Sequence, residues 1–167
     1  MPESLAGLEA IVITVSDSVS QGTSQDTSGP EVRSILEQAG AEVLELQIVP
    51  DDREQIEKHL ISACERAALV VTTGGTGVAP RDVTPDATLA VSERIVPGIG
   101  ESMRRVSLEK TPHAILSRAG GAILGRSLIL NLPGSPGGVR DCLNAVLNVI
   151  PHAVRLLGEE PTPHLQT

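Results

Sequence analysis

The sequence predicts a three-layer α/β/α domain built on a mostly parallel β-sheet. Short, β-branched apolar runs alternate along the chain with segments in which apolar residues recur at helical spacing. Strands that alternate with helices form mostly parallel sheets covered on both faces. The chain has 167 residues, the length of one domain, and it contains neither an internal repeat nor a dividing linker.

The first half of the chain supplies three predicted strands and two predicted helices. The strands are expected at residues 10–15, 43–49 and 69–73. Ser28 and Glu31 have the spacing of a capping box at the start of the first helix, which Gly40 ends. Asp52 is placed to cap the second helix, whose apolar residues form one stripe.

The second half is predicted to contain further helices and a hairpin. Thr84 and Pro85 open a helix, as its cap and its first-turn proline. A second helix, with apolar residues on one face, ends before residue 111. Segments 116–124 and 127–132 flank a turn at Gly125, which indicates a hairpin or two adjacent strands.

A long helix is expected to close the domain. It starts at about residue 136, and Pro151 should kink or divide it, because proline lacks the N–H that a helix interior needs. Residues 159–167 contain two prolines and are expected to form a loose tail. The domain itself is therefore assigned to residues 1–158.

Composition excludes several classes of function. The chain has no Phe, Trp or Tyr and a formal net charge of −8, so binding of single-stranded nucleic acid through stacking and a basic groove is not expected. No apolar run approaches the ~20 residues of a membrane span, and residues 1–5 do not resemble a signal peptide.

Cys64 and Cys142 lack CxxC partners and are expected to pack as small apolar residues. These features predict a cytoplasmic protein.

Polar and glycine residues collect where four predicted strands end. The four turns are Ser16-Asp17-Ser18, Pro50-Asp51-Asp52, Gly74-Gly75-Thr76-Gly77 and Leu132-Pro133-Gly134-Ser135. Ligands of open parallel sheets bind outside the carboxyl ends of the strands. If the strands are parallel, all four turns share one edge of the sheet.

Two of these turns have the character of a phosphate site. The glycines of residues 74–77 allow backbone N–H groups to approach an anion, and Ser135 opens a helix whose free N–H groups favour a phosphate. Both features are also compatible with simple tight turns, and Ser135 with capping alone. Lys58 and Lys110 lie far from the glycines, so no Walker A loop is present. Pro80 occupies the third glycine position of a dinucleotide fingerprint.

Three aspartates in or beside the same loops suggest a metal. Asp51, Asp82 and Asp86 could present carboxylates to a polyphosphate, where Mg²⁺ takes one or two carboxylates and keeps several waters. Asp86 could instead serve a helix dipole and Asp51 a second cap, whereas Asp82 has no helix to cap directly. The cations most available to a phosphate are Arg81, Arg118 and Arg140.

The loops, taken together, resemble the Mog/MoaB family of molybdenum-cofactor biosynthesis. The resemblance is carried by Thr72-Thr73-Gly74-Gly75-Thr76-Gly77, by the segment 80–88 (PRDVTPDAT) and by Asn131-Leu132-Pro133-Gly134-Ser135-Pro136. Segments 16–18, 28–30, 49–52 and 111–118 extend it. It covers the chain in order from about residue 8 to residue 157. Within segment 111–118, His113 could equally contact a ligand or simply pack.

The resemblance implies a molybdopterin adenylyltransferase, which converts molybdopterin and ATP into adenylyl-molybdopterin and pyrophosphate with Mg²⁺. It also implies a homo-oligomer, usually a trimer and in some relatives a hexamer. Asp51 and Asp82 match the family's essential aspartates, and we expect them to hold the Mg²⁺. The expected substrate-binding residues are Ser16, Asp17, Gly74, Gly75, Thr76, Gly77, His113, Ser117, Arg118, Pro133, Gly134 and Ser135.

Two other functions are compatible with parts of the sequence. Some proteins of this fold bind molybdopterin or act as scaffolds without catalysis, although the presence of both Asp51 and Asp82 favours the enzyme. A nucleotide-dependent oxidoreductase is disfavoured, because the dinucleotide fingerprint fails and the chain offers no aromatic side chain for stacking.

Overall fold

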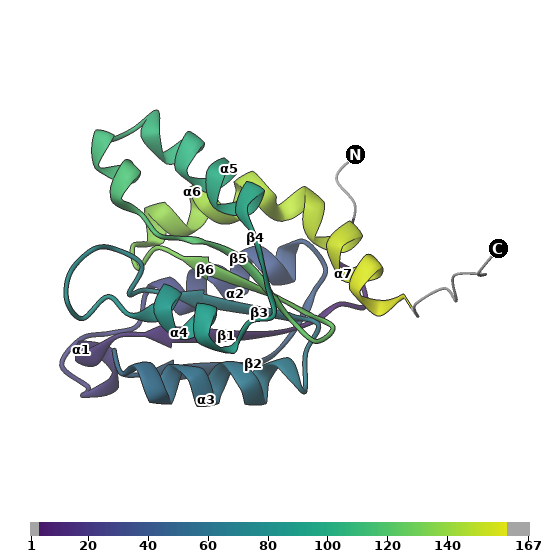
Figure 1. The fold of residues 1–167 in the computed structure, drawn as a ribbon, viewed down its shortest axis with the longest axis horizontal. Coiled ribbons are helices and arrows are strands. Elements are labelled where there is room, and N and C mark those ends of the chain that lie inside the picture. Colours follow the sequence, from purple (N-terminus) through teal and green to yellow (C-terminus); the bar gives the residue numbers. More distant parts are fainter. Residues whose placement is uncertain (1–3, 160–167) are drawn as a thin grey trace.

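A six-stranded sheet forms the middle layer of the computed structural model, which describes residues 4–159 (Figure 1). Its strands are β1 (Glu9–Val15), β2 (Glu42–Val49), β3 (Leu69–Thr73), β4 (Arg94–Val96), β5 (Gly120–Leu124) and β6 (Ser127–Leu132). They lie in the order β2-β1-β3-β6-β5-β4. Strands β2, β1, β3 and β6 are parallel, and β5 runs antiparallel to both of its neighbours. The predicted α/β/α fold with a mostly parallel sheet is confirmed.

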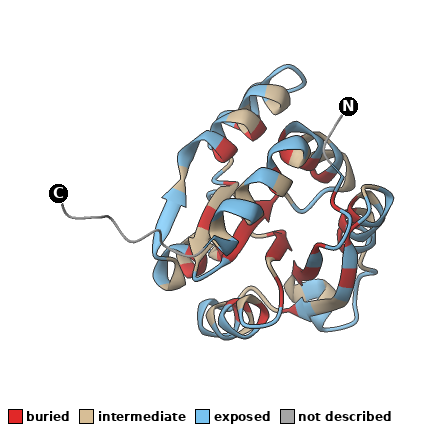
Figure 2. Ribbon diagram, turned by 90° about the vertical axis from the view of Figure 1, so that its right-hand side faces the viewer, coloured by how far each residue is buried: buried red, intermediate tan, exposed pale blue. Residues whose placement is uncertain are grey.

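Helices cover both faces of the sheet. They are α1 (Asp17–Ser20), α2 (Ser28–Gln38), α3 (Arg53–Cys64), α4 (Thr84–Val91), α5 (Pro97–Leu108), α6 (Pro136–Val146) and α7 (Ile150–Gly158), with short 3₁₀ helices η1 (Pro112–Leu116) and η2 (Leu147–Val149). Helices α2, α5, α6 and α7 pack on one face, and α3 and α4 pack on the other. The central strands therefore lie between two helical layers (Figure 2).

The core is aliphatic and consists of two clusters of buried side chains, one on each face of the sheet. In β1, Ala10 and Val12 face the cluster under α2, whereas Ile11 and Ile13 face the cluster under α3. This alternation follows from the period of two in a strand, and burial on both sides explains why the strand is apolar throughout.

Both cysteines are free and lie on helices, as the structural interpretation predicted. Cys142, on α6, is buried, and Cys64 closes α3. Burial raises the pKa of the Cys64 thiol to about 11, so this thiol is protonated at neutral pH.

The hairpin around Gly125 is confirmed, but two details of this region differ from the prediction. Strands β5 and β6 pair antiparallel, and Gly125 takes a left-handed backbone conformation between them. Residues 116–119 do not belong to the strand, because η1 extends to Leu116 and β5 begins only at Gly120. The edge strand β4 was not predicted, since Arg94 and Ile95 are exposed and the segment is too short to show a period.

Of the caps predicted for α2, α3 and α4, two are wrong and one is confirmed. Ser28 lies inside α2, where Asp26 Oδ1 accepts the N–H of Gly29 at 3.0 Å in place of the expected capping box. Thr84 also lies inside its helix, and its hydroxyl donates to the carbonyl of Gly74 at 2.9 Å. Asp52 does cap α3, accepting from Gln55 N–H at 2.9 Å.

The closing helix is divided as predicted. Helix α6 ends at Val146, η2 follows, and α7 begins at Ile150 with Pro151 in its first turn. Of the predicted tail at residues 159–167, all but residue 159 lies outside the described residues, as do residues 1–3. Within residues 4–159, no helix combines the length and apolar character needed to span a bilayer.

Candidate active site

The four polar turns meet at one edge of the sheet. They follow β1, β2, β3 and β6, which are neighbours in the sheet and share one direction. Ser16 N–H donates to the carbonyl of Val49 at 2.9 Å, and Gly74 N–H donates to the carbonyl of Leu132 at 3.0 Å. We call this set of turns, residues 16–18, 50–52, 74–77 and 133–135, the rim.

Glycine is required in the 74–77 loop for two reasons. Gly74 and Gly75 have φ of +104° and +68°, the left-handed region that side chains rarely adopt. A Cβ at Gly74 would also collide with the carbonyl oxygen of Val15. The loop therefore packs directly on the end of β1.

Three amides of this loop are available to an anion. Within residues 4–159, the N–H groups of Gly75, Thr76 and Gly77 donate to no protein acceptor. The expected donation from Gly74 is wrong, because its N–H continues the sheet ladder to Leu132. Consecutive free amides in a glycine-containing loop form a concave site for phosphate oxygens.

Asp51 is tied to Asp17 across the rim. Asp17 N–H donates to Asp51 Oδ2 at 3.0 Å, and Asp51 N–H donates to Asp17 Oδ1 at 3.0 Å. Partial burial is the main cause that raises the pKa of the Asp51 carboxyl, and the nearby charges of Asp17 and Asp82 raise it further. The hydrogen bond from Asp17 N–H and the positive charge of Arg81 partly offset this increase. Because Asp52 caps α3, Asp51 is not needed as a second cap.

Asp82 borders the same glycine loop. Its Oδ2 accepts the N–H of Ala79 at 3.0 Å and would lie 2.7 Å from a Cβ placed on Gly77. Asp51 Oδ1 would lie 3.1 Å from a Cβ placed on Gly75. The two carboxylates thus flank the loop that presents the free amides.

The two carboxylates fit a magnesium ion that is shared with phosphates. Within the described residues, Oδ1 of Asp51 and Oδ1 of Asp82 have no hydrogen-bond partner. The same part of the chain contains no group of three or more His, Cys, Asp or Glu that could enclose a metal. Mg²⁺ commonly takes one or two carboxylates and completes its shell with water and substrate phosphates. A cation beside Asp51 would also offset the burial and the neighbouring negative charges that raise the pKa of this carboxyl.

Two cavities open beside these carboxylates. The first, of about 320 Å³, is lined by Ser16, Asp51, Gly74, Gly75, Asp82 and Gly134, among others. The second, of about 520 Å³, is lined by Thr76, Gly77, Asp82, His113, Ser117, Pro133 and Ser135, among others. Asp82 belongs to both linings, so it lies between two spaces that could each receive a substrate.

Asp17 and Arg118 line neither of these two cavities, alone among the predicted site residues. The carboxylate of Asp17 accepts two hydrogen bonds from Arg81, and the guanidinium of Arg118 binds Asp86 and two loop carbonyls. Ser135 caps α6 by accepting the N–H of Gly138 at 3.1 Å, as its alternative interpretation predicted.

Thr14 and Asp26 line the first cavity and were missed from the sequence. Thr14 Oγ1 donates to Asp26 Oδ2 at 2.9 Å, which holds the 21–27 loop against the end of β1. Thr14 was assigned to the buried strand, and it is indeed buried. The available signal was Asp26 itself, a capping residue type three positions before Gly29.

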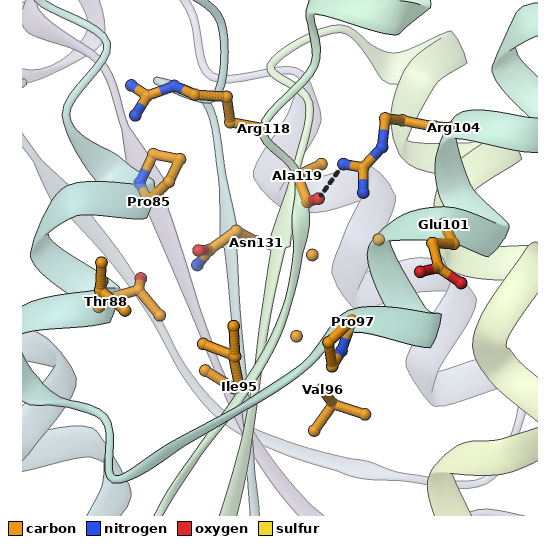
Figure 3. A pocket seen from close by; sticks show the side chains of 15 residues that line it. Pro85, Thr88, Ile95, Val96, Pro97, Glu101, Arg104, Arg118, Ala119 and Asn131 are labelled. Atoms are coloured by element: carbon orange, nitrogen blue, oxygen red, sulfur yellow. Dashed lines mark hydrogen bonds between the residues drawn. The ribbon is translucent and has the colours of Figure 1, made fainter.

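A third cavity, of about 320 Å³, lies away from these carboxylates, between α4, β4 and α5 (Figure 3). Its lining includes Pro85, Ile95, Pro97, Glu101 and Arg104. The hydroxyl of Thr88 is buried there and has no hydrogen-bond partner within the described residues.

Comparison with known proteins agrees with the resemblance of the loops. Residues 11–152 match the family described as "Probable molybdopterin binding domain". A molybdopterin adenylyltransferase of Helicobacter pylori (strain J99) is 47% identical over 150 residues, which cover 87% of this chain and 85% of the relative. The enzyme of that name from Escherichia coli (strain K12) is 44% identical over 151 residues, with 86% and 77% covered. The crystal structure of the molybdopterin biosynthesis enzyme MoaB from Thermus thermophilus superposes with a TM-score of 0.84 at 47% identity, covering 92% of this chain and 98% of that one.

Proposed function

The chain belongs to this molybdopterin-binding domain family, and we propose that it is a molybdopterin adenylyltransferase of molybdenum-cofactor biosynthesis. The reaction joins ATP and molybdopterin into adenylyl-molybdopterin and releases pyrophosphate. One observation in this structure supports it above others. Two carboxylates flank a loop with three free amides, and one of them, Asp82, lies between two cavities.

The rim can promote this transfer without a nucleophilic side chain. A phosphate oxygen of the pterin attacks the α-phosphorus of ATP, a new P–O bond forms, and the bond to the bridging oxygen of pyrophosphate breaks. Such transfers depend mainly on alignment of the reactants and on neutralisation of their charge. The two cavities on either side of Asp82 allow the two substrates to meet there.

Each part of the rim has a role in this scheme. The amides of Gly75, Thr76 and Gly77 donate to phosphate oxygens, and Asp51 and Asp82 hold Mg²⁺ through their free oxygens. Bound Mg²⁺ supplies charge neutralisation for the phosphates. Pro133, Gly134 and Ser135, at the start of α6, fix a further phosphate or the pterin. We also place the protein in the cytoplasm, where ATP is available.

We further propose that the protein assembles into a homo-oligomer, with a trimer expected. Large apolar side chains are exposed around two adjoining hollows that share Glu101 and Arg104. The third cavity is lined by Leu89 on α4 and Ile95 on β4, and the other hollow by Leu108 on α5 and Ile115 on η1. Large apolar side chains that are exposed close to one another are typical of interaction sites in proteins. A second copy that covers these side chains would also close the third cavity, which Leu89 and Ile95 line.

The test is the release of pyrophosphate from ATP by the purified protein with Mg²⁺ and molybdopterin. We expect release that requires all three components and that stops when EDTA removes the metal. Tight binding of molybdopterin without any release of pyrophosphate would contradict the proposal and would indicate a binding or scaffold protein.

A further inference from the structure

We propose that Arg81 and Arg118 are positioning residues that hold the main chain at Asp51 and Asp82, a role that rests on the proposed adenylyl transfer. Each arginine bonds the main-chain carbonyl of one of the two aspartates, and each is in turn held by a further aspartate. The same arrangement thus occurs twice at the rim, with different residues.

Arg81 forms the first clamp. Its Nε donates to Asp17 Oδ2 at 2.6 Å, and its Nη2 donates both to Asp17 Oδ1 at 3.0 Å and to the carbonyl of Asp51 at 3.1 Å. Asp17 also exchanges two hydrogen bonds with Asp51. Asp17, Arg81 and Asp51 therefore form a closed set of contacts. Because Arg81 directly precedes Asp82, this set also ties the Asp82 loop to the Asp51 turn.

Arg118 forms the second clamp. Its Nη2 donates to the carbonyl of Asp82, its Nε donates to the carbonyl of Gly77 at 2.9 Å, and its Nη1 donates to both carboxylate oxygens of Asp86 at 3.1 and 3.0 Å. Its own N–H donates to the carbonyl of Thr76 at 2.8 Å. All three guanidinium nitrogens are thus used to close the 76–86 loop.

These contacts argue against a direct phosphate-binding role for the two arginines. Arg81 uses its planar fork, Nε and Nη2, on Asp17, and Arg118 uses all three guanidinium nitrogens on Asp86 and two carbonyls, so neither presents a free fork to a phosphate. Arg81 and Arg118 line neither of the two cavities beside Asp51 and Asp82. The arginines are better placed to fix where those two carboxylates point than to contact the substrates.

If the two arginines are positioning residues, their loss should affect the rate of the reaction separately from the stability of the fold. An exposed ion pair contributes little to the free energy of unfolding, and the side chains of Arg81 and Arg118 are 67% and 37% exposed. A displacement of about 1 Å at a catalytic group can nevertheless reduce a rate about a hundredfold. Loss of either clamp should therefore reduce turnover much more than thermal stability.

The experiment compares Arg81→Gln, Arg118→Gln, Arg81→Lys and Arg118→Lys with Arg66→Gln. Arg66 is the matched control, because it forms a similarly exposed ion pair with Glu45 at 2.7 Å and contacts no rim residue. We expect both Gln variants to lower kcat by about tenfold to a hundredfold with a smaller change in KM for ATP. Lysine should not rescue, because it keeps the charge but lacks the fork.

Hydrogen–deuterium exchange supplies a readout that does not depend on catalysis. Arg118→Gln should accelerate exchange in segment 76–86 and leave the Asp51 amide, which donates to Asp17, unchanged. Arg81→Gln should accelerate exchange at the Asp51 amide, and Arg66→Gln should do neither.

The outcomes separate this proposal from the proposed function. Full activity in the Lys variants with a raised KM in the Gln variants would overturn it in favour of simple phosphate binding, and exchange equal to that of Arg66→Gln would also overturn it. A wild-type protein that releases no pyrophosphate would overturn the adenylyl transfer, whereas the exchange experiment would still report on the clamps.

Discussion

Asp51 combines partial burial with neighbouring negative charge. Burial and the charges of Asp17 and Asp82 raise the pKa of its carboxyl, so ionised Asp51 costs stability in the folded protein without metal. Such an arrangement is typical of a site that sacrifices stability for function. Asp51 can be tested separately for its effects on stability and on turnover.

We expect Asp51→Asn to raise the free energy of unfolding at pH 7, by about 1 kcal/mol or less at this partly exposed site, while it abolishes most turnover. Asparagine still offers an oxygen to the N–H of Asp17. Because the pKa of Asp51 is raised in the folded state, the increase in the free energy of unfolding should be present at pH values above that folded-state pKa. The increase should vanish as the pH falls below about 3.9, where the wild-type Asp51 is protonated in both the folded and the unfolded state. Urea unfolding without Mg²⁺ at pH 7 and pH 3.5 measures this, and an equal effect at both pH values would contradict it.

Asp82 is expected to be dispensable for the fold. The Asp82→Asn variant can still accept the N–H of Ala79, so its melting temperature should stay close to that of the wild type. Its kcat should fall about a hundredfold or more, since loss of one charge-stabilising group commonly has this effect. Asp141→Asn is the matched control, because Asp141 lies on α6 outside the rim, where it forms an ion pair with Lys110. Near-normal pyrophosphate release by Asp82→Asn would remove this residue from the mechanism.

At the scale of elements, the 74–77 loop is the part of the rim that follows β3, and its backbone is held by two neighbouring elements. Gly74 N–H continues the ladder to β6, and Thr84 at the start of α4 donates to the Gly74 carbonyl. The loop is therefore fixed by the sheet on one side and by a helix on the other. Its three free amides are presented by a rigid support.

The Gly74→Ala substitution should lower the free energy of unfolding by about 2–4 kcal/mol relative to the wild type. The substitution combines a left-handed φ with a collision against the carbonyl of Val15. Gly125→Ala has a left-handed φ but open space around the new Cβ, so it should cost only about 1–2 kcal/mol. Urea unfolding of the two variants separates backbone strain from collision. Equal losses would show that the contact with Val15 adds nothing.

At the scale of the whole molecule, four of the exposed large apolar residues lie on α4, β4, α5 and η1, at the third cavity and at the hollow next to it. Figure 2 shows exposed residues on β4, one of the two edge strands of the sheet. An edge strand with unpaired backbone groups and exposed apolar side chains is an unfavourable surface for a monomer.

If this surface is covered by further copies of the chain, Ile95→Glu should reduce the molecular mass in solution to that of the monomer. A buried glutamate without a partner would cost several kcal/mol at each interface. Ile61→Glu, on the exposed side of α3, is the control and should leave the mass unchanged. Sedimentation velocity measures both variants. A monomeric wild type, or an Ile95→Glu protein of unchanged mass, would contradict the proposed assembly.

The sequence by itself determined the layered fold and the gathering of four turns at one edge. Both depend on local information, because hydrophobic periodicity defines strands and helices, and parallel strands necessarily end on the same side. Asp51, Asp82 and the glycine loop were therefore predicted to lie together from their positions after the strands, and the structure brings them together.

Only the tertiary structure decided which groups of that edge are free. Arg81 is bound by Asp17, 64 positions away, and Arg118 by Asp86, 32 positions away, so neither is the available cation that its position suggested. Gly74 likewise gives its N–H to β6. Hydrogen-bond partners distant in the chain depend on how the elements pack, and no local pattern encodes that choice.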